Sequence, residues 1–283
     1  MRTNTGQVLY IPRIGQRADF QHPLMKGCVG WWPLNDGAGT KAVDLSGNGN
    51  DGTQSGGVSW ASTEKGTAAS FDGVDDYFAE DTSTPAAINS NGFPHSISAW
   101  IYLDNASAIN FGAALGNAST TNTLCCVQLF SSGVARYLYR SGSTIIIVAS
   151  TSTTTAGAWY HVVGVSESTT SHKIYLNGVL EATDTTSVTA SNNFTNFSIG
   201  ALRRSTVDYG EGKVQNVRVY SRALSASEIL ELYTNPWAGL SIPSETRYFF
   251  FSSPSPIINP FSKIITSSTI LNTSGKTVIR RGA

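Results

Sequence analysis

Several stretches of the chain alternate between apolar and polar residues, which is the period of a β-strand with one buried face. The alternation is clearest in residues 96–103, 159–165 and 213–220. The longest apolar run, residues 145–149, has the length of a single strand. We therefore expect β-strands over most of the region from Val29 to Tyr233.

Two local signals add a hairpin and a helix to this pattern. Asn177 and Gly178 form the strongest hairpin signal, because both tolerate the positive φ of a type I′ turn. Ser225 and Glu228 have the spacing of a capping box, and Asn235–Pro236 should end the helix that follows it. Many strands, one short C-terminal helix and no strand–helix–strand alternation predict an all-β fold, an antiparallel β-sandwich.

The pattern divides the chain into three segments. Residues 1–24 form an irregular lead-in, and residues 25–237 carry the strand pattern. Residues 238–283 include the aromatic run 248–251; they are too apolar for a free tail and too rich in proline for another sheet. We expect the middle segment to be the sandwich and both flanks to be extended arms, the last of which packs on a neighbour in an assembly.

The charge balance excludes some partners. Charged residues make up only 13% of the chain, and 19 basic residues balance 19 acidic ones. No basic excess favours nucleic acid, and no polybasic or long apolar run favours a membrane. A net charge of zero does little to keep a free monomer soluble, so it favours an assembled state such as a homo-oligomer. The N-terminus lacks the charged and apolar regions of a signal peptide.

The three cysteines do not indicate a metal site or a disulfide framework. Cys28, Cys125 and Cys126 have neither the spacing of metal ligands nor that of a disulfide-rich domain. The adjacent pair would point to opposite faces of a strand. We expect all three to be small buried residues.

A glycine-rich loop follows Asp44. Residues 47–52 match the G-x-G-x-x-G pattern of dinucleotide sites, but no apolar strand precedes them and no helix can follow, so we interpret them as a tight turn. The loop does supply oxygen atoms of the kind that Ca²⁺ prefers, from Asp44, Asn48, Asn50 and Asp51. It is a candidate calcium site, with Asp44 and Asn50 as the best ligands.

Catalytic motifs are missing from the sequence, whereas aromatic residues suggest binding. The histidines are scattered, and neither Gly-x-Ser-x-Gly nor His-Glu-x-x-His occurs, so we expect no enzyme activity. Aromatic rings that lie on the surface could stack on sugar rings. The tyrosines expected to be exposed, beside arginines, are Tyr137, Tyr139 and Tyr209.

Six motifs occur in order over roughly residues 24–237, and the first of them begins at His22, at the end of the lead-in. They are H-P-L-x-x-G-x-V-G-W-W-P-L, D-x-S-G-N-G-N-D-G, F-D-G-V-D-D-Y, S-A-W-I, Y-L-N-G-V-L and V-R-V-Y-S-R-A-L-S. In combination they resemble the laminin-G-like (concanavalin-A-like lectin/glucanase) jelly-roll domain. The resemblance implies a fold that usually binds rather than catalyses, and the Glu-x-Asp-x-(x)-Glu strand of related glycosidases is missing.

The resemblance also implies roles for individual residues. The loop aspartate, here Asp44, often helps to bind a structural Ca²⁺, and its usual acidic helper is replaced by Asn216, which offers an oxygen but no charge. The acidic segment 72–76 corresponds to a hairpin turn that leads into a core aromatic residue, Tyr77. His161 corresponds to a residue that packs and hydrogen-bonds within a strand.

The flanking segments narrow the setting. Residues 22–27 and 233–237 resemble laminin-G-like proteins of tailed bacteriophages and prophages, whereas secreted eukaryotic members carry signal peptides and disulfides. This implies a structural protein of the virion, a capsid decoration or tail-associated protein that assembles in the bacterial cytoplasm and contacts other virion proteins. The alternative is a carbohydrate-binding adhesion module that recognises a glycan of the host surface.

Overall fold

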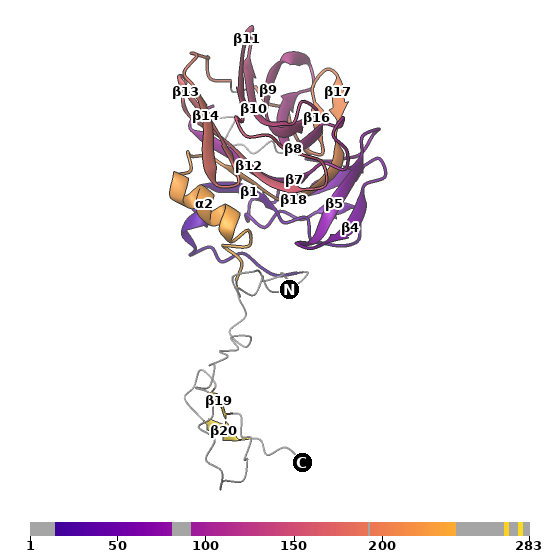
Figure 1. Ribbon diagram of the computed structural model, residues 1–283, viewed down its shortest axis with the longest axis vertical. Helices are drawn as coiled ribbons and strands as arrows, with labels where there is room; N and C mark the ends of the chain where they lie inside the picture. Colours follow the sequence, from indigo (N-terminus) through magenta and orange to yellow (C-terminus); the bar gives the residue numbers. More distant parts are fainter. Residues whose placement is uncertain (1–14, 81–91, 192, 242–268, 272–276, 280–283) are drawn as a thin grey trace. The chain divides into compact units, whose positions relative to one another are not determined.

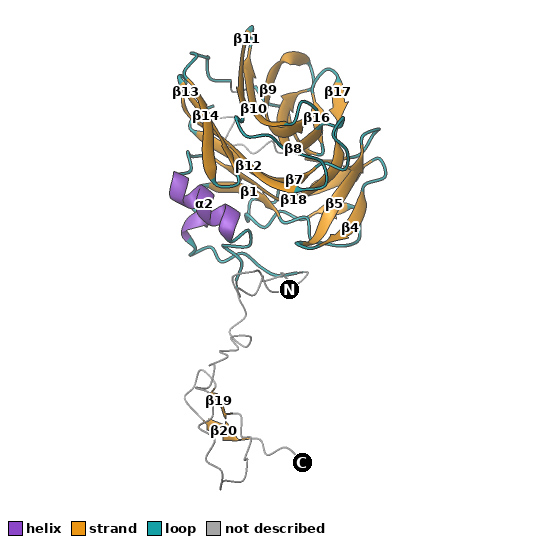
Figure 2. Cartoon of the chain, in the orientation of Figure 1, coloured by secondary structure: helices purple, strands orange, loops and turns teal. Residues whose placement is uncertain are grey.

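Two antiparallel sheets stack face to face in the computed structural model (Figures 1 and 2). The structure describes residues 15–80, 92–191 and 193–241, and the strands at 269–271 and 277–279. The chain separates into two compact units, Met1–Ser241 and Ile242–Ala283. The all-β sandwich with one short helix is confirmed. The predicted arm of residues 238–283 lies, from residue 242 on, largely outside the described residues.

The first sheet has the strand order β14-β13-β12-β7-β18-β5-β4, and β1 pairs with β18. Its neighbouring strands are all antiparallel. The strands are β1 (Cys28–Trp32), β4 (Ser59–Thr63), β5 (Gly66–Asp72), β7 (His95–Tyr102), β12 (Trp159–Ser168), β13 (Ser171–Leu176), β14 (Val179–Asp184) and β18 (Glu211–Tyr220).

The second sheet has the order β11-β10-β9-β8-β15-β6-β3-β2 and is also antiparallel. Its strands are β2 (Lys41–Ala42), β3 (Gly52–Ser55), β6 (Tyr77–Glu80), β8 (Asn110–Asn117), β9 (Thr120–Phe130), β10 (Val134–Ser141), β11 (Thr144–Ala149) and β15 (Asn196–Ile199).

Four short elements complete the described chain. They are the 3₁₀ turn η1 (Pro23–Met25), the helix α2 (Ala226–Thr234), and two hairpins, β16 (Ala201–Arg203) with β17 (Val207–Tyr209) and β19 (Thr269–Leu271) with β20 (Thr277–Ile279). In the part of the chain that the structure describes, no helix has the length and apolar character needed to cross a membrane.

The first and last strands of the sandwich are neighbours. β1 pairs with the second half of β18, with Trp32 opposite Val217. The two adjacent tryptophans of β1 point to opposite faces of the sheet, as alternation requires. Trp32 belongs to the core between the sheets, where its ring stacks on Phe197 at 4.3 Å, whereas Trp31 belongs to a cluster on the outer face. Gly30 makes room for this arrangement, because a Cβ there would lie 2.3 Å from the Trp32 ring.

Apolar residues fill three layers, and each layer has its own cover. The largest lies between the two sheets. A second lies on the outer face of the first sheet, where Ile229 and Leu232 of α2 pack with Trp31. A third lies on the outer face of the second sheet, where Leu202 of the β16–β17 hairpin covers Phe111 of β8. Both outer faces are therefore partly closed by a short element.

The local signals read from the sequence are confirmed. Asn177 and Gly178 have φ values of 50° and 84° and connect β13 to β14. The Ser225 side chain accepts a hydrogen bond from the Glu228 N–H in a complete capping box at the start of α2. Cys125 and Cys126 point to opposite faces of β9, into the first and third apolar layers, and both are buried.

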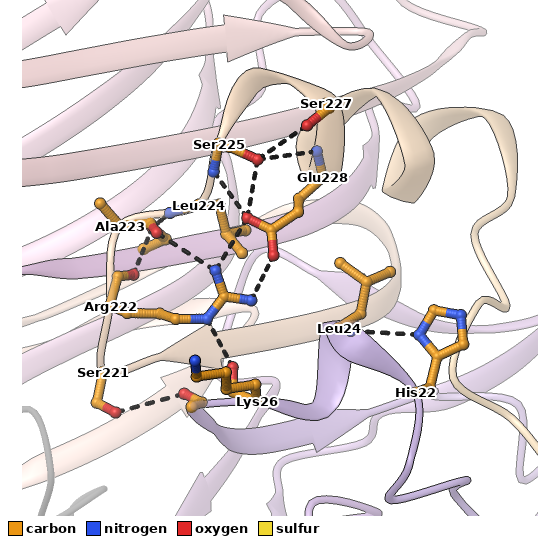
Figure 3. A network of polar contacts seen from close by, with 12 residues as sticks. His22, Leu24, Lys26, Ser221, Arg222, Ala223, Leu224, Ser225, Ser227 and Glu228 are labelled. Atoms are coloured by element: carbon orange, nitrogen blue, oxygen red, sulfur yellow. Dashed lines mark hydrogen bonds and ion pairs between the residues drawn. The ribbon is translucent and has the colours of Figure 1, made fainter.

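A polar clasp joins the start of the sandwich to the start of α2 (Figure 3). The Arg222 guanidinium donates to both carboxylate oxygens of Glu228, at 2.7 and 2.9 Å, and to the carbonyl of Lys26 at 2.6 Å. These hydrogen bonds hold the pKa of the Glu228 carboxyl at about 2, below its ordinary value. A bidentate pair fixes orientation as well as distance. The clasp therefore sets the position of α2 relative to the start of the sandwich, just before β1.

Both ends of the sandwich also pair with each other. The Asp19 N–H donates to the Gly239 carbonyl at 2.7 Å, and the Ser241 N–H donates to the Arg17 carbonyl at 2.8 Å. Ala18 and Leu240 form an antiparallel bridge between them. Residues 17–19 and 239–241 therefore leave the sandwich side by side, and the compact unit continues past Trp237, where the sequence placed the boundary.

Candidate functional site

The Asp44 carboxylate, the first candidate calcium ligand, is buried and accepts five hydrogen bonds. Its Oδ1 accepts from the backbone N–H groups of Trp31 at 2.9 Å and Ser46 at 2.8 Å. Its Oδ2 accepts from the Ser46 hydroxyl, the Asn50 N–H and the Asn50 side-chain amide, at 2.8 to 3.1 Å. A carboxylate has about four lone-pair sites. Donors of the protein itself therefore occupy both oxygens.

Asn216 lies at the far end of the Trp31 side chain. Its Oδ1 accepts a hydrogen bond from the Trp31 indole Nε1 at 2.8 Å, and its side-chain amide donates to the Pro236 carbonyl. Its φ of 51° lies in the left-handed region, which asparagine tolerates better than most residues. Asp44 and Asn216 thus bind opposite ends of one tryptophan. The side-chain oxygens of Asp44 and Asn216 face hydrogen-bond donors, and the Asn50 side chain directs its amide NH₂ at the Asp44 carboxylate, so this set of residues does not fit a calcium ion.

A second acidic group forms the predicted turn. Carboxylate oxygens of Asp72, Asp75 and Asp76 lie within 4.8 Å of one another. The Asp72 carboxylate accepts from the Val74 N–H at 2.8 Å, and the buried Asp76 carboxylate accepts from the N–H groups of Gly57 and Asp72. These bonds are those of a structured turn. The aromatic residue after it was placed wrongly: Tyr77 is partly exposed, and Phe78 fills the core, because β6 alternates in this register.

Tyr137 and Tyr139 are not on the surface, so their predicted exposure is wrong. Both side chains are fully buried between the sheets. They lie on the same face of β10, two residues apart, and this face turns inward. The Tyr139 hydroxyl accepts from the Ser191 N–H at 2.6 Å. Neither ring can stack on a sugar in this structure.

Tyr137 belongs instead to a buried chain of polar groups. Its hydroxyl lies 2.7 Å from His95 Nε2 and 2.6 Å from the Ser166 hydroxyl, which lies 2.8 Å from His172 Nδ1. His95 Nδ1 lies 2.5 Å from the Gly92 carbonyl. Burial, with a smaller contribution from the neighbouring His172, lowers the pKa of His95 to about 4. The chain links strands of both sheets.

His161 also has the structural role that the sequence predicts. Its Nε2 lies 2.8 Å from the Ser98 hydroxyl of the neighbouring strand, and its ring packs on Trp100 at 5.3 Å between centroids. Burial, together with the charges of Arg218 and Lys65, lowers its pKa to about 3. Both histidines are therefore neutral in the folded protein near pH 7.

Tyr209 is the one predicted surface tyrosine that the structure leaves partly exposed. It ends β17 and stacks on Tyr77 of β6, with 6.2 Å between ring centroids. The Arg203 guanidinium lies 5.0 Å from the centre of the Tyr77 ring. An ion pair between Arg204 and Asp208 holds the β16–β17 hairpin that carries Tyr209 and Arg203. The three side chains form an aromatic and cationic surface, which we call the Tyr77–Tyr209 platform.

An open polar pocket adjoins this platform. Its volume is about 460 Å³, and Tyr77 forms part of its wall. The remaining wall comes from β2, the glycine-rich loop, β3 and the rest of β6, with Lys41, Asp51 and Thr53 among the lining residues. The sequence did not indicate this pocket, because its residues come from strands that become neighbours only in the second sheet.

A second aromatic pair lies on the outer face of the first sheet. Tyr102 and Trp159 are partly exposed and lie 5.4 Å apart between ring centroids. Lys213 covers the Tyr102 ring at 4.5 Å and is also paired with Asp104. This pair provides a comparison for the Tyr77–Tyr209 platform, because it adjoins neither Tyr77 nor the pocket.

With this geometry established, comparison with known proteins identifies the family. Residues 71–230 match a laminin-G-type domain of the concanavalin A-like lectin/glucanases superfamily. The chain belongs to this superfamily. No curated protein matches it at a significant level. The superfamily assignment agrees with the jelly-roll resemblance of the six motifs.

Solved structures share the fold at low sequence identity. Domain 4 of the extracellular arabinanase AbnA from Geobacillus stearothermophilus, solved with arabinotriose, has a TM-score of 0.56 and 17% identity, over 73% of this chain and 98% of that chain. The binding domain of Paraclostridial Mosquitocidal Protein 1 has a TM-score of 0.58 and 16% identity, over 74% of this chain and 52% of that one.

A botulinum neurotoxin type C structure, from a toxin that depends on two ganglioside molecules to enter cells, has a TM-score of 0.56 and 13% identity, over 74% of this chain and 51% of that one. The matched region thus spans about half the length of the toxin chains. At these identities the likeness shows the fold alone.

We predict that the Asp44 loop is stable without metal. The melting temperature should be the same in EDTA and in added CaCl₂. Asp44→Asn should lower the free energy of unfolding by about 2–4 kcal/mol, because buried donors lose a charged acceptor. The exposed Asp75→Asn is the matched control and should change little. A melting temperature that rises with calcium would contradict the assignment.

We also predict that acid destabilises the protein through its buried histidines. Because the folded pKa of His95 lies below the ordinary value of 6.5, the unfolded chain binds the proton first, and stability is lost as pH falls from about 6.5 towards 4. Melting temperatures between pH 7.5 and 5 should therefore fall. His95→Gln should flatten this slope, whereas His22→Gln, at a partly exposed histidine, should not. If the slope were unchanged in His95→Gln, the loss of stability at low pH would have to come from other groups.

Proposed function

We propose that the chain is a binding module without enzyme activity, which recognises glycan through the Tyr77–Tyr209 platform. The observation that carries the proposal is the pair of partly exposed tyrosine rings beside an open polar pocket. Aromatic faces with a few converging polar groups are the usual composition of a small-molecule site. The folds it resembles include a domain solved with arabinotriose and a toxin that uses gangliosides, which supports this choice.

The absence of enzyme activity is part of the same proposal. The carboxylates that cluster among the described residues, Asp72, Asp75 and Asp76, are engaged in a turn. The buried histidines have pKa values lowered well below neutrality and face the interior. General acid–base chemistry needs a group with a pKa near the working pH within reach of substrate.

We further propose that this module is displayed on the virion of a tailed bacteriophage, as a capsid decoration or tail-associated protein. The proposal rests on the phage-like flanks of the sequence and on the pairing of residues 17–19 with 239–241. Since both ends leave the sandwich together, a single attachment point would leave the rest of the surface free. Glycan binding then serves attachment to a host surface.

The glycan proposal predicts the effect of one substitution. Tyr209→Ala should weaken binding to glycans found on a printed array by about tenfold or more, because tyrosine rings often dominate such sites. Trp159→Ala removes the comparison pair and should leave affinity unchanged. If only Trp159→Ala lost binding, the site would lie on the first sheet instead.

The virion proposal predicts the effect of a deletion. Removing residues 242–283 keeps the whole first compact unit, so the sandwich should fold while incorporation into particles is lost. Mass spectrometry of purified particles measures incorporation and copy number. Many copies indicate decoration of the capsid, and a few copies indicate a tail position. If the deletion left incorporation unchanged, residues 242–283 would not be the anchor.

A further inference from the structure

Two arginines and several apolar residues share the outer face of the second sheet, at its β11 edge. Alternate residues of β10 point into the core, as Tyr137 does, so Arg136, Leu138 and Arg140 point outward. The strand register places the exposed isoleucines of β11 beside them. This surface, which we call the β10–β11 patch, consists of Phe130, Arg136, Leu138, Arg140, Ile145 and Ile147.

The arginines of the patch have no acidic partner among the described residues. The Arg136 guanidinium lies over the Phe130 ring, 3.5 Å from its centroid, and its buried Nε has no hydrogen-bond partner there. Arg140 donates to two backbone carbonyls, at 3.2 and 3.4 Å. The sequence contains no aspartate or glutamate from residue 105 to residue 166. This part of the chain therefore leaves the positive charge of the patch without a neighbouring negative charge.

Apolar side chains lie between and beside these charges. Ile145 and Ile147 are 43% and 46% exposed, and Leu138 between the two arginines is partly exposed. β11 is also the last strand of its sheet, so its outer backbone groups have no neighbouring strand in the described part of the sheet. A surface of this composition fits a partner that brings an apolar group and carboxylates together.

The acidic turn of the same chain, residues 72–76, has the complementary composition. Val74 is 67% exposed, and the exposed residues Asp72 and Asp75 lie on either side of it. Among the described residues, no ion pair involves this turn. Three of its carboxylates have oxygens within 4.8 Å of one another. Because like charges at this distance repel, a cation brought to the turn would be favoured.

The turn and the patch lie too far apart to meet within one molecule. The turn joins β5 to β6, and β15, β8 and β9 separate β6 from β10 in the second sheet. With about 4.8 Å between neighbouring strands, β6 and β10 are roughly 19 Å apart. In Figure 1, β10 and β11 lie at the top of the sandwich and β5 at its lower right. A contact between the two surfaces therefore needs two copies of the chain.

We propose that copies of this chain associate head to tail, with the turn 72–76 of one copy bound to the β10–β11 patch of the next. Val74 packs against Leu138 and the isoleucines, and the carboxylates beside it face the two guanidinium groups. Because the two surfaces differ, the contact is heterologous and either closes into a ring or continues as a chain. The inference names the surfaces of self-association and does not depend on glycan binding.

The first test measures self-association of the full chain by analytical ultracentrifugation. We expect association at about 50 mM NaCl and a loss of affinity of about tenfold or more at about 500 mM, because salt screens exposed charges. Asp75→Lys should weaken association by about tenfold or more at low salt, since it places a cation opposite the arginines. Glu64→Lys is the matched control: it makes the same change at an exposed residue between β4 and β5 and should associate like the unmodified protein.

A mixing experiment tests whether the two surfaces meet. Chains with Arg136→Glu and Arg140→Glu together should not associate by themselves, but mixing them with Asp75→Lys chains should restore association. In the mixture, the intact acidic turn of the first variant meets the intact arginines of the second. Melting temperatures show whether each variant is folded, and Arg140→Glu alone replaces the double variant if Arg136→Glu disturbs the packing on Phe130.

Three results overturn the inference. The unmodified chain could stay monomeric at low salt up to its highest soluble concentration, Asp75→Lys could associate normally, or the mixture could stay monomeric. If Asp75→Lys associates normally and Ile147→Lys does not, two β11 edges pair with each other instead. If only removal of residues 242–283 abolishes association, that segment makes the contact. A glycan array probed with the same variants reports on the glycan function separately.

Discussion

The tie between Asp44 and Trp31 determines how this sandwich closes. Trp31 lies on the first strand of the sandwich. Its backbone N–H is bound by the Asp44 carboxylate, and its indole N–H is bound by Asn216 of the last strand, β18. The Arg218 guanidinium covers the same ring at 3.9 Å from its centroid and also holds the Pro236 and Ala238 carbonyls. Trp31 and the two β18 side chains that hold it thus connect the first strand, the glycine-rich loop and the segment after the helix.

The hydrogen bonds to Asp44 explain how the glycine-rich loop keeps its shape. In related jelly rolls the corresponding aspartate often binds a cation, which neutralises it. Here five N–H and O–H donors surround the carboxylate, and hydrogen bonds to a charged acceptor are about twice as strong as neutral ones. The loop therefore reaches a fixed shape through its own amide groups. That shape matters beyond the junction, because the loop leads directly into β3 and supplies one wall of the polar pocket.

The sequence was sufficient to predict local structure. It was not sufficient to predict which face of a strand is buried or which distant segments of the chain become neighbours. Asn177–Gly178 and the Ser225–Glu228 box depend on residues close in sequence, so their signals were reliable. The two tyrosines of β10 share one face of the strand, but alternation alone does not tell which face turns inward. In the structure this face is the inward one, so Tyr137 is part of a buried network with histidines. For the same reason, the sequence placed Tyr77 in the core, where the structure places Phe78. The pocket joins Lys41, Thr53 and Tyr77, which only strand pairing brings together.

The pairing of residues 17–19 with 239–241 gives the domain a defined mechanical behaviour. When two antiparallel segments are pulled apart from the same end, their hydrogen bonds break one after another, as in a zipper, and each step resists only a small force. Tension between the two flanks would therefore open this short ladder first, while β1 and β18 stay paired behind it and Trp31 remains bound at both ends. The ladder would then act as an extensible joint that yields under load and spares the sandwich.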